Sequence, residues 1–112
     1  MTDWRDVAAR HRTLVRDANE LISANFEKTD HHEATCVFSC ECDDPACGDT
    51  VSLTRCEYEL VRASPTRFVI MADHEDPQIE HLVAENARFA IVETLPGTTS
   101  RIALRSDPRA AR

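Results

Sequence analysis

Glycine, long hydrophobic runs and positive charge are all scarce in this 112-residue chain. Two glycines, Gly48 and Gly97, cannot supply the glycine-rich loop that cradles phosphates in nucleotide-binding proteins. No stretch approaches the roughly 20 apolar residues of a membrane-spanning helix, and the charged N-terminus lacks the apolar segment of a secretory signal. We therefore expect a cytoplasmic protein with no membrane partner.

Acidic residues outnumber basic ones and give a formal net charge of −7. Four of them, Glu41, Asp43, Asp44 and Asp49, lie among the cysteines. Such a charge balance repels a phosphate backbone, so it disfavours nucleic acid as a partner and favours a basic protein surface. The length suits one globular domain with a small core.

All five cysteines lie between Cys36 and Cys56. A secreted disulfide scaffold would spread an even number of cysteines along the chain, so metal or redox chemistry is the better interpretation. Three of them form the pattern Cys40-x-Cys42-x4-Cys47. Because Zn²⁺ takes thiolate sulphur and imidazole nitrogen in a closed tetrahedral shell, the sequence predicts a structural zinc site.

His74 is the predicted fourth ligand, completing the set Cys40, Cys42, Cys47 and His74. Residues 34–39 and 50–53 are β-prone and should form a hairpin with the three thiols at its tip. Residues 67–71 should form a strand that ends just before His74. Four other residues are substitute ligands: His31, His32, Cys36 and Cys56.

The predicted fold class is α+β, with a long N-terminal amphipathic helix followed by a small mixed domain of β-hairpins and helices that carries the metal-binding loop. The helix should span residues 1–28, the Cys-rich domain residues 34–105 and a flexible tail residues 106–112. Within the domain, Thr54 and Glu57 fit a capping box that opens a short helix.

Residues 77–86 are predicted to form another helix, which begins at Pro77 and carries Ile79, Leu82 and Val83. Residues 88–95 and 101–104 alternate in hydrophobicity and are predicted to be two strands joined by a turn.

Apolar residues recur every three or four positions along the N-terminal helix, which marks one face. Read as heptads, the seam is Trp4, Val7, His11, Leu14, Ala18, Leu21 and Asn25. A stripe of this kind more often packs on its own domain, which is the favoured interpretation. The alternative is self-association through this helix, in which polar His11 and Asn25 would fix the register.

Motifs through most of the chain resemble a family of small, uncharacterised actinobacterial proteins. The shared segments are Arg16-Asp17-Ala18-Asn19-Glu20-Leu21-Ile22, Phe38-Ser39-Cys40-Glu41-Cys42 with Cys47, Leu53-Thr54-x-x-Glu57-Tyr58-Glu59-x-Val61-Arg62, and Arg67-Phe68-Val69 with His74-Glu75. The resemblance implies a shared Cys40, Cys42, Cys47 and His74 site and no activity. In that family the histidine follows Pro-Gly, whereas Ala72-Asp73 precede it here. Asp tolerates a left-handed turn, so the ligand loop can still form.

Three other readings of the cysteines stay open. An iron–sulphur cluster could recruit Cys36 or Cys56 as a fourth thiolate. His32-x3-Cys36-x3-Cys40 weakly resembles the core of zinc-binding anti-sigma factors, but Ser39 stands where that family needs a cysteine. Catalytic zinc would need an open position with Glu41 or Glu75 as base, and three sulphurs argue against it.

We therefore expect a zinc-binding protein that is not an enzyme and that acts as a regulatory protein–protein interaction module. The alternative is a thiol or metal redox sensor, which would hold zinc or an iron–sulphur cluster and release a partner when its cysteines are oxidised.

Overall fold

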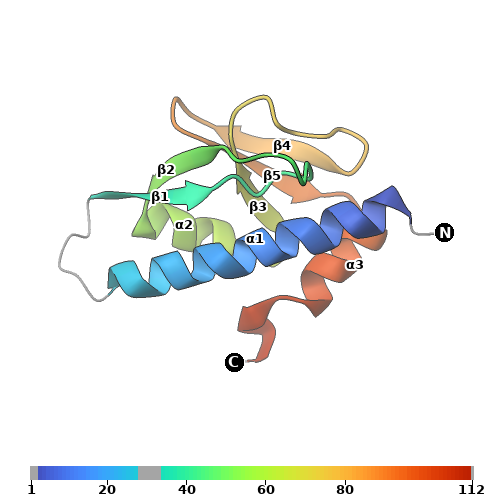
Figure 1. The fold of residues 1–112 in the computed structure, drawn as a ribbon, viewed down its shortest axis with the longest axis horizontal. Helices are drawn as coiled ribbons and strands as arrows, with labels where there is room; N and C mark the ends of the chain where they lie inside the picture. Colours follow the sequence, from blue (N-terminus) through green and yellow to red (C-terminus); the bar gives the residue numbers. More distant parts are fainter. Residues whose placement is uncertain (1–2, 28–33, 112) are drawn as a thin grey trace.

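The computed structural model describes residues 3–27 and 34–111 and confirms an α+β fold that begins with a long helix (Figure 1). The elements follow in this order: α1 (Trp4–Glu27), β1 (Thr35–Ser39), β2 (Thr50–Thr54), α2 (Arg55–Arg62), β3 (Arg67–Ile70), β4 (Glu80–Glu85), β5 (Ala90–Thr94), α3 (Thr98–Arg105) and a 3-10 helix, η1 (Pro108–Ala111). Among these described residues, no helix combines the length and the apolar character needed to cross a bilayer.

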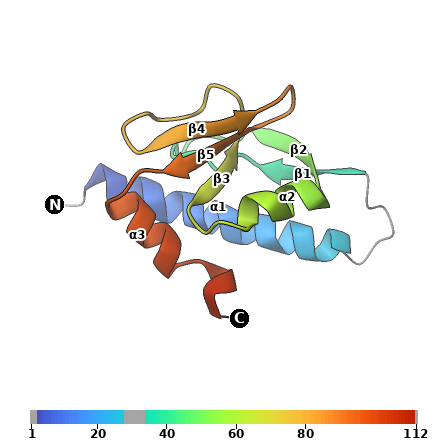
Figure 2. The ribbon, with the colours of Figure 1, turned by 180° about the vertical axis from the view of Figure 1, so that it is seen from behind.

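The strands form two small antiparallel sheets on one side of α1 (Figures 1 and 2). One is the β1–β2 hairpin, in which Thr35 pairs with Thr54 and Ser39 with Thr50. The other has the order β3-β5-β4. Helix α3 packs against α1, and α2 lies between the two sheets in sequence and contacts β2 and β3.

Two hydrophobic clusters form the core. The first joins the hairpin, α2 and the three-stranded sheet, and its members are Phe38, Val51, Leu53, Tyr58, Val61, Val69 and Phe89. Phe38 and Tyr58 stack in it with ring centroids 4.4 Å apart. The second cluster contains Cys40 and Cys42 together with Phe68, Ile70, Ala90, Val92 and Ala103. Two of the three thiols are therefore part of the core itself.

Helix α1 docks through a polar face, which overturns the favoured expectation that its heptad seam packs on the domain. Its buried side chains are Ala8, Ala9, Arg12, Thr13, Arg16, Asn19 and Ser23. Trp4, Val7, Leu14 and Leu21 from the seam are exposed instead. The apolar period correctly predicts a helix, but the partners of its buried face are polar backbone groups and a ring.

Two buried arginines explain this orientation. Arg12 donates to the carbonyl oxygen of Glu41 through Nε and Nη2, at 3.1 and 2.9 Å, and forms an ion pair with Glu80 at 2.6 Å. Arg16 donates to the carbonyls of Pro65 and Ala103. Both guanidinium groups lie over the ring of Phe68, at 4.2 and 5.1 Å from its centroid. The arginines thus satisfy buried backbone acceptors and also supply cation–π contacts.

The predicted helix at residues 77–86 is wrong, because this segment forms β4. Pro77 lies in a turn instead of a first helical turn, since the carboxylate of Asp76 accepts from the N–H of Gln78 at 3.0 Å. The chain then pairs with β5 from Glu80↔Thr94 to Glu85↔Ala90, with a bulge between Leu82 and Ala84. Pairing with an available strand edge outweighs the short three-and-four spacing.

The predicted strand at residues 101–104 is also wrong, because α3 covers it. The helix begins after Gly97, whose φ of +134° glycine tolerates and which turns the chain out of β5. Thr99, Ile102 and Ala103 then fall on one buried face. An alternating run of four residues is too short to distinguish a strand from a helix.

The remaining predicted elements are confirmed. The thiol hairpin, the strand at β3 and β5 lie where expected, and α2 opens with the capping box. Glu57 N–H donates to the Thr54 hydroxyl at 3.1 Å and Thr54 N–H donates to the Glu57 carboxylate at 2.8 Å. Residues 106–111, expected as part of a flexible tail, include η1, where Arg109 forms ion pairs with Glu20 and Glu59.

Candidate metal centre

The end of β1 and the loop before β2 carry the three thiols. Cys40 comes directly after β1, and its N–H donates to the carbonyl of Asp49 at 2.9 Å, which closes the hairpin beyond its last strand pair. Within the loop, the Cys47 N–H donates to the carbonyl of Asp44 at 3.0 Å and the Ala46 N–H to the Asp44 carboxylate at 2.9 Å. These turns fold the short Cys42-to-Cys47 segment back on itself.

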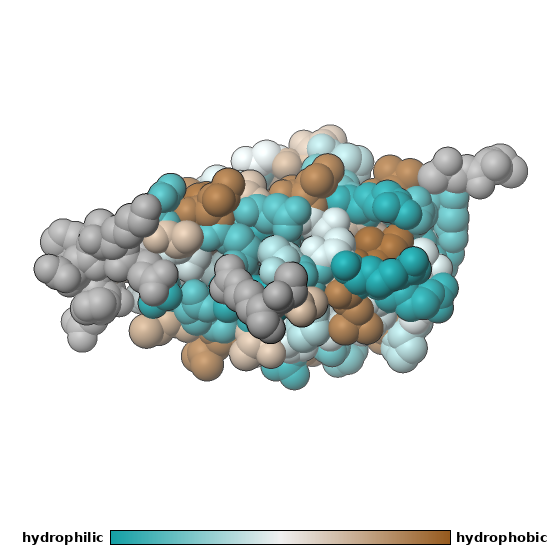
Figure 3. All heavy atoms as spheres, turned by 90° about the horizontal axis from the view of Figure 1, so that it is seen from below, coloured by the Kyte–Doolittle hydropathy of each residue, from teal (hydrophilic) through white to brown (hydrophobic). Residues whose placement is uncertain are grey.

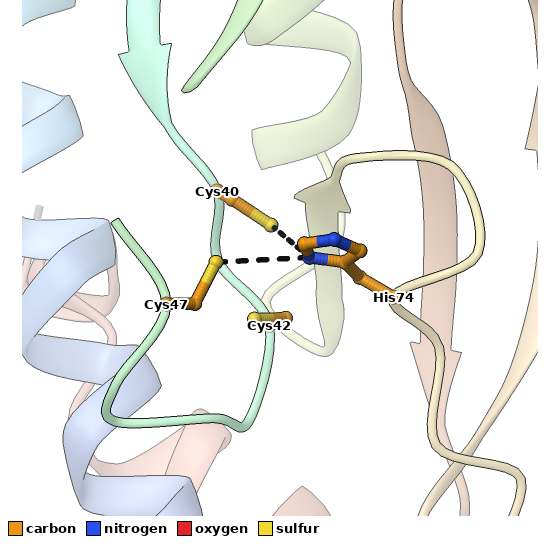
Figure 4. Close-up of side chains that lie close together, drawn as sticks. All are labelled: Cys40, Cys42, Cys47 and His74. Carbon is orange, nitrogen blue, oxygen red and sulfur yellow. Dashed lines mark hydrogen bonds between the residues drawn. The ribbon is translucent and has the colours of Figure 1, made fainter. Parts of the chain in front are cut away.

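A tight turn after β3 brings in His74. Its N–H donates to the carbonyl of Met71 at 3.1 Å, and Asp73 has a φ of +69°. The expectation that Asp73 takes a left-handed conformation is therefore confirmed. The turn places the imidazole beside sulphurs that lie about 30 residues earlier in the chain (Figure 4).

The four predicted ligand atoms converge. The sulphurs of Cys40, Cys42 and Cys47 and a ring nitrogen of His74 all lie within 4.8 Å of one another. Nδ1 of His74 is 3.5 Å from Cys40 Sγ and 3.6 Å from Cys47 Sγ, and the side chains face a common point (Figure 4). The structure thus brings together every residue of the predicted site.

These separations fit a tetrahedral ion better than hydrogen bonds. Zn–S distances of about 2.3 Å and Zn–N distances of about 2.05 Å place sulphur and nitrogen about 3.5 Å apart at a tetrahedral angle. Nδ1 of His74 meets that spacing with two sulphurs at once. A single ring lone pair can accept only one S–H bond well. The donor set and its spacing therefore suit a closed Cys3His shell.

Backbone N–H groups point at the sulphurs, as coordinated thiolates require. Met71 N–H donates to Cys40 Sγ at 3.2 Å. A hydrogen bond from the Cys42 thiol, together with those from backbone amides, lowers the pKa of Cys40. Without a metal, Cys40 is therefore the thiol that ionises first, and Cys42 holds the shared proton.

The other two thiols have raised pKa values. The hydrogen bond to Cys40 and then burial raise the pKa of Cys42, while burial is the main cause of the raised pKa of Cys47. Backbone N–H groups of Asp44 and Asp49 oppose these shifts at Cys42 and Cys47 respectively. A cation at the centre would replace those protons, because a metal-bound thiol is deprotonated.

Asp49 orients the imidazole. Its Oδ2 lies 3.5 Å from Nε2 of His74, on the side of the ring opposite the sulphurs. A carboxylate at this nitrogen favours the tautomer with a proton on Nε2, which leaves the Nδ1 lone pair for a metal. The sequence placed Asp49 near the thiols but gave no sign of this role, since it depends on the turn at Asp73.

Glu41, which could be proposed as a catalytic base from sequence, is instead a buried positioning residue. Its Oε2 accepts from Asn19 Nδ2 at 2.8 Å and from the Tyr58 hydroxyl at 2.9 Å, while Oε1 accepts from Val69 N–H at 3.0 Å. Burial raises its pKa, and the three donors oppose that rise. The side chain fixes the segment between Cys40 and Cys42.

The substitute ligands do not join the site. Cys36 pairs with Leu53 in the hairpin and lies four residues before Cys40 along the strand, and Cys56 is exposed on α2. Neither belongs to the ligand cluster found among the described residues. His31 and His32 lie outside the residues that the structure describes.

Acidic side chains gather beside the ligands. Burial and then the neighbouring Asp76 raise the pKa of Asp43 to about 6, with a further contribution from Glu80. Together with Asp44 and Asp49, these groups make the rim of the site negative. Because three thiolates already outnumber the charge of a divalent cation, the loaded site would carry further negative charge.

A separate groove of about 550 Å³ lies between α1, α2 and η1. Its described lining holds no cysteine or histidine, and the charged residues in it, including Arg109, Glu20 and Glu59, are already paired with one another. The groove therefore offers none of the nucleophiles or metal ligands that an active site would need.

Comparisons of this chain with family models, with curated proteins and with solved structures found no match. The interpretation of the site therefore depends on its geometry and chemistry.

Proposed function

We propose that this protein binds one zinc ion in a structural site formed by Cys40, Cys42, Cys47 and His74, and that it acts through protein–protein contact and not by catalysis. The observation that carries the zinc assignment is the pair of 3.5 and 3.6 Å separations between Nδ1 and two sulphurs, within a cluster of four soft ligand atoms. Four protein ligands leave no position for a reactive water, which is typical of structural zinc sites.

The position of the ligands in the fold supports a structural role. Cys40 and Cys42 are buried members of the second core cluster, and Cys47 packs against it. The thiols come from the β1–β2 hairpin and the imidazole from the connection after β3, so an ion here would tie the two sheets together. Binding free energy at such a site contributes to folding.

An iron–sulphur cluster with four cysteine ligands has less support. Neither Cys36 nor Cys56 reaches the ligand group among the described residues. The site offers three thiolates and an imidazole, a set that zinc commonly takes. Protein purified without oxygen should therefore be colourless and should contain one zinc per chain.

Metal analysis of serine variants tests the proposal. Replacing Cys42 by serine (C42S) removes a buried ligand and should reduce the zinc content of purified protein well below one per chain. The C56S variant is the matched control, because Cys56 is an exposed cysteine on α2 outside the ligand group. We expect C56S to keep full zinc content and wild-type stability.

Equal zinc content in the C42S and C56S proteins would refute the site. A folded wild-type protein that stays metal-free after refolding with excess zinc would refute it as well. Because C42S also removes a core side chain, the zinc content of H74A provides a second measurement at a half-exposed ligand.

The partial exposure of Cys47 favours a redox sensor as the second candidate function. Cys47 is half-buried in a loop whose neighbours Asp44 to Ala46 and Gly48 to Thr50 are exposed, so an oxidant can reach it. Oxidation would remove a ligand and release the ion. Brief peroxide treatment, with released zinc measured by a chromogenic chelator, separates the candidates: a purely structural site retains its zinc.

A further inference from the structure

The outward face of α1 carries an apolar stripe that the rest of the described chain leaves uncovered. Leu14 and Leu21 are 68% and 69% exposed, and Val7 and Trp4 are 47% and 43% exposed. Brown hydrophobic groups are visible among teal polar ones along the molecule in Figure 3. The stripe runs over about 26 Å of helix, from Trp4 to Leu21, at the helical rise per residue.

The spacing of the stripe is that of a coiled-coil seam. Trp4, Val7, His11, Leu14, Ala18 and Leu21 alternate steps of three and four residues, and this seam points away from the face that buries Arg12 and Arg16. A helix that packs only on its own domain has no reason to repeat this pattern on its exposed side. A second helix with the same repeat would cover the stripe by inserting knobs into holes.

We infer that a second copy of this chain covers the stripe, with the two α1 helices antiparallel. In this arrangement Trp4 lies opposite Leu21 of the second copy, Val7 opposite Ala18, and His11 opposite Leu14. Twofold symmetry repeats each contact, so the interface is isologous and closes as a dimer.

Charge complementarity selects the antiparallel orientation. Arg10 and Asp17 flank the seam on one side, one heptad apart, and both are exposed. Antiparallel helices bring Arg10 of each copy next to Asp17 of the other, which gives two ion pairs. Parallel helices would instead place Arg10 beside Val15 of the second copy and Asp17 beside Ile22, with no opposite charges.

This interface is separate from the metal ligands. The stripe faces away from the residues that dock α1 onto the sheets, and the ligands lie beyond that docked face. The dimer therefore goes beyond the proposed zinc site, and failure of one leaves the other standing. Zinc content of the interface variants distinguishes the two, because it should stay at the wild-type value.

Sedimentation of zinc-loaded, full-length protein across micromolar concentrations tests the inference. Wild type should pass from monomer to dimer, and the emission of Trp4, the only tryptophan, should shift to shorter wavelength as the dimer forms. Leu14→Glu should weaken dimerisation by at least about 100-fold, since it buries two charges opposite His11. Leu60→Glu is the matched control, because Leu60 is 74% exposed on α2 outside the stripe.

Charge reversal tests the orientation. Arg10→Asp and Asp17→Arg should each weaken the dimer by about tenfold, and the double variant should restore it, because the reversed charges again pair across the antiparallel interface. Asp6→Asn controls for the ion pair between Arg10 and Asp6 within the helix and should leave dimerisation unchanged.

Three results would overturn the inference. They are a monomeric wild type throughout the concentration range, equal loss of dimer in the Leu14→Glu and Leu60→Glu variants, and a double charge reversal that fails to restore association. The last of these would reject the antiparallel pairing even if a dimer forms.

Discussion

Glu41 shows how one residue between two ligands couples the site to the rest of the molecule. Its side chain accepts three hydrogen bonds, from α1, α2 and β3, and its backbone oxygen accepts two more from Arg12. Every partner is a donor, so the group is held as an acceptor in the core. Sequence reasoning found the carboxylate but gave it the wrong environment, because its three partners come from distant segments.

Replacing Glu41 by glutamine (E41Q) should destabilise the protein by about 1–3 kcal/mol. The amide nitrogen that replaces one oxygen would face a donor, either Val69 N–H or the Asn19 and Tyr58 pair, and leave it unsatisfied. Chemical denaturation of zinc-loaded protein measures the loss. Glu85→Gln is the control, since Glu85 is exposed at the end of β4, and an E41Q protein as stable as E85Q would contradict the role.

At the scale of elements, the sequence predicts best where a local signal and a tertiary contact agree. The capping box at Thr54, the thiol hairpin and the left-handed Asp73 each depend on a few neighbouring residues, and all three are confirmed. The convergence of His74 on the thiols could be predicted because ligand chemistry restricts the choice to few residues.

The remaining elements depend on contacts that a local pattern does not contain. β4 becomes a strand because β5 offers it an edge, and α3 becomes a helix because its buried face meets α1. The docked face of α1 could not be read from hydrophobicity, since Arg12 and Arg16 bury themselves by binding carbonyls and the ring of Phe68. Tertiary hydrogen bonding outweighs apolar periodicity there.

A surface ion pair joins the β4–β5 hairpin to α2 and predicts a pH dependence. The hydrogen bond from Arg88, at 2.6 Å to Glu57 Oε2, is the main cause that lowers the pKa of Glu57 to about 2. An acid with a lowered pKa contributes stability above its unfolded pKa of about 4.3, and this contribution disappears as the pH falls toward 2.

A double-mutant cycle with E57Q and R88A should give a coupling free energy of about 0.5–1 kcal/mol at pH 7, because the pair is exposed to solvent. The coupling should shrink as the pH falls from 4 to 2. Glutamine keeps the capping box, so E57Q isolates the charge. Urea denaturation at several pH values measures the coupling, and the same value at pH 7 and pH 3 would contradict the assignment.

At the scale of the whole molecule, the proposed ion would join parts that share few other constraints. The hairpin and the three-stranded sheet are separate sheets, linked by core packing and by the Glu41 N–H donating to the carbonyl of Val69 at 2.8 Å. A small domain of this size buries a limited core, and a metal staple is a common remedy. Zinc removal should therefore affect the melting of the whole domain as well as the loop.

Chelation at pH 7.5 should lower the melting temperature by about 10 °C or more, because the binding free energy of a structural zinc ion is folding free energy. Calorimetry with and without a strong chelator measures the change. The exposed-cysteine variant C56S should show the same drop as wild type, whereas C42S should begin at the lower temperature and respond little.

Acidification should release the ion in the same way. The raised pKa values of Cys42 and Cys47 mean that protons compete for these sulphurs as soon as the metal leaves. Each proton that binding displaces weakens the apparent affinity by up to about tenfold per pH unit as the pH falls. Zinc transfer to a chromogenic chelator should therefore be far more complete at pH 5 than at pH 7.5, and identical transfer at the two pH values, after correction for the chelator's own titration, would mean that the thiols are not ligands.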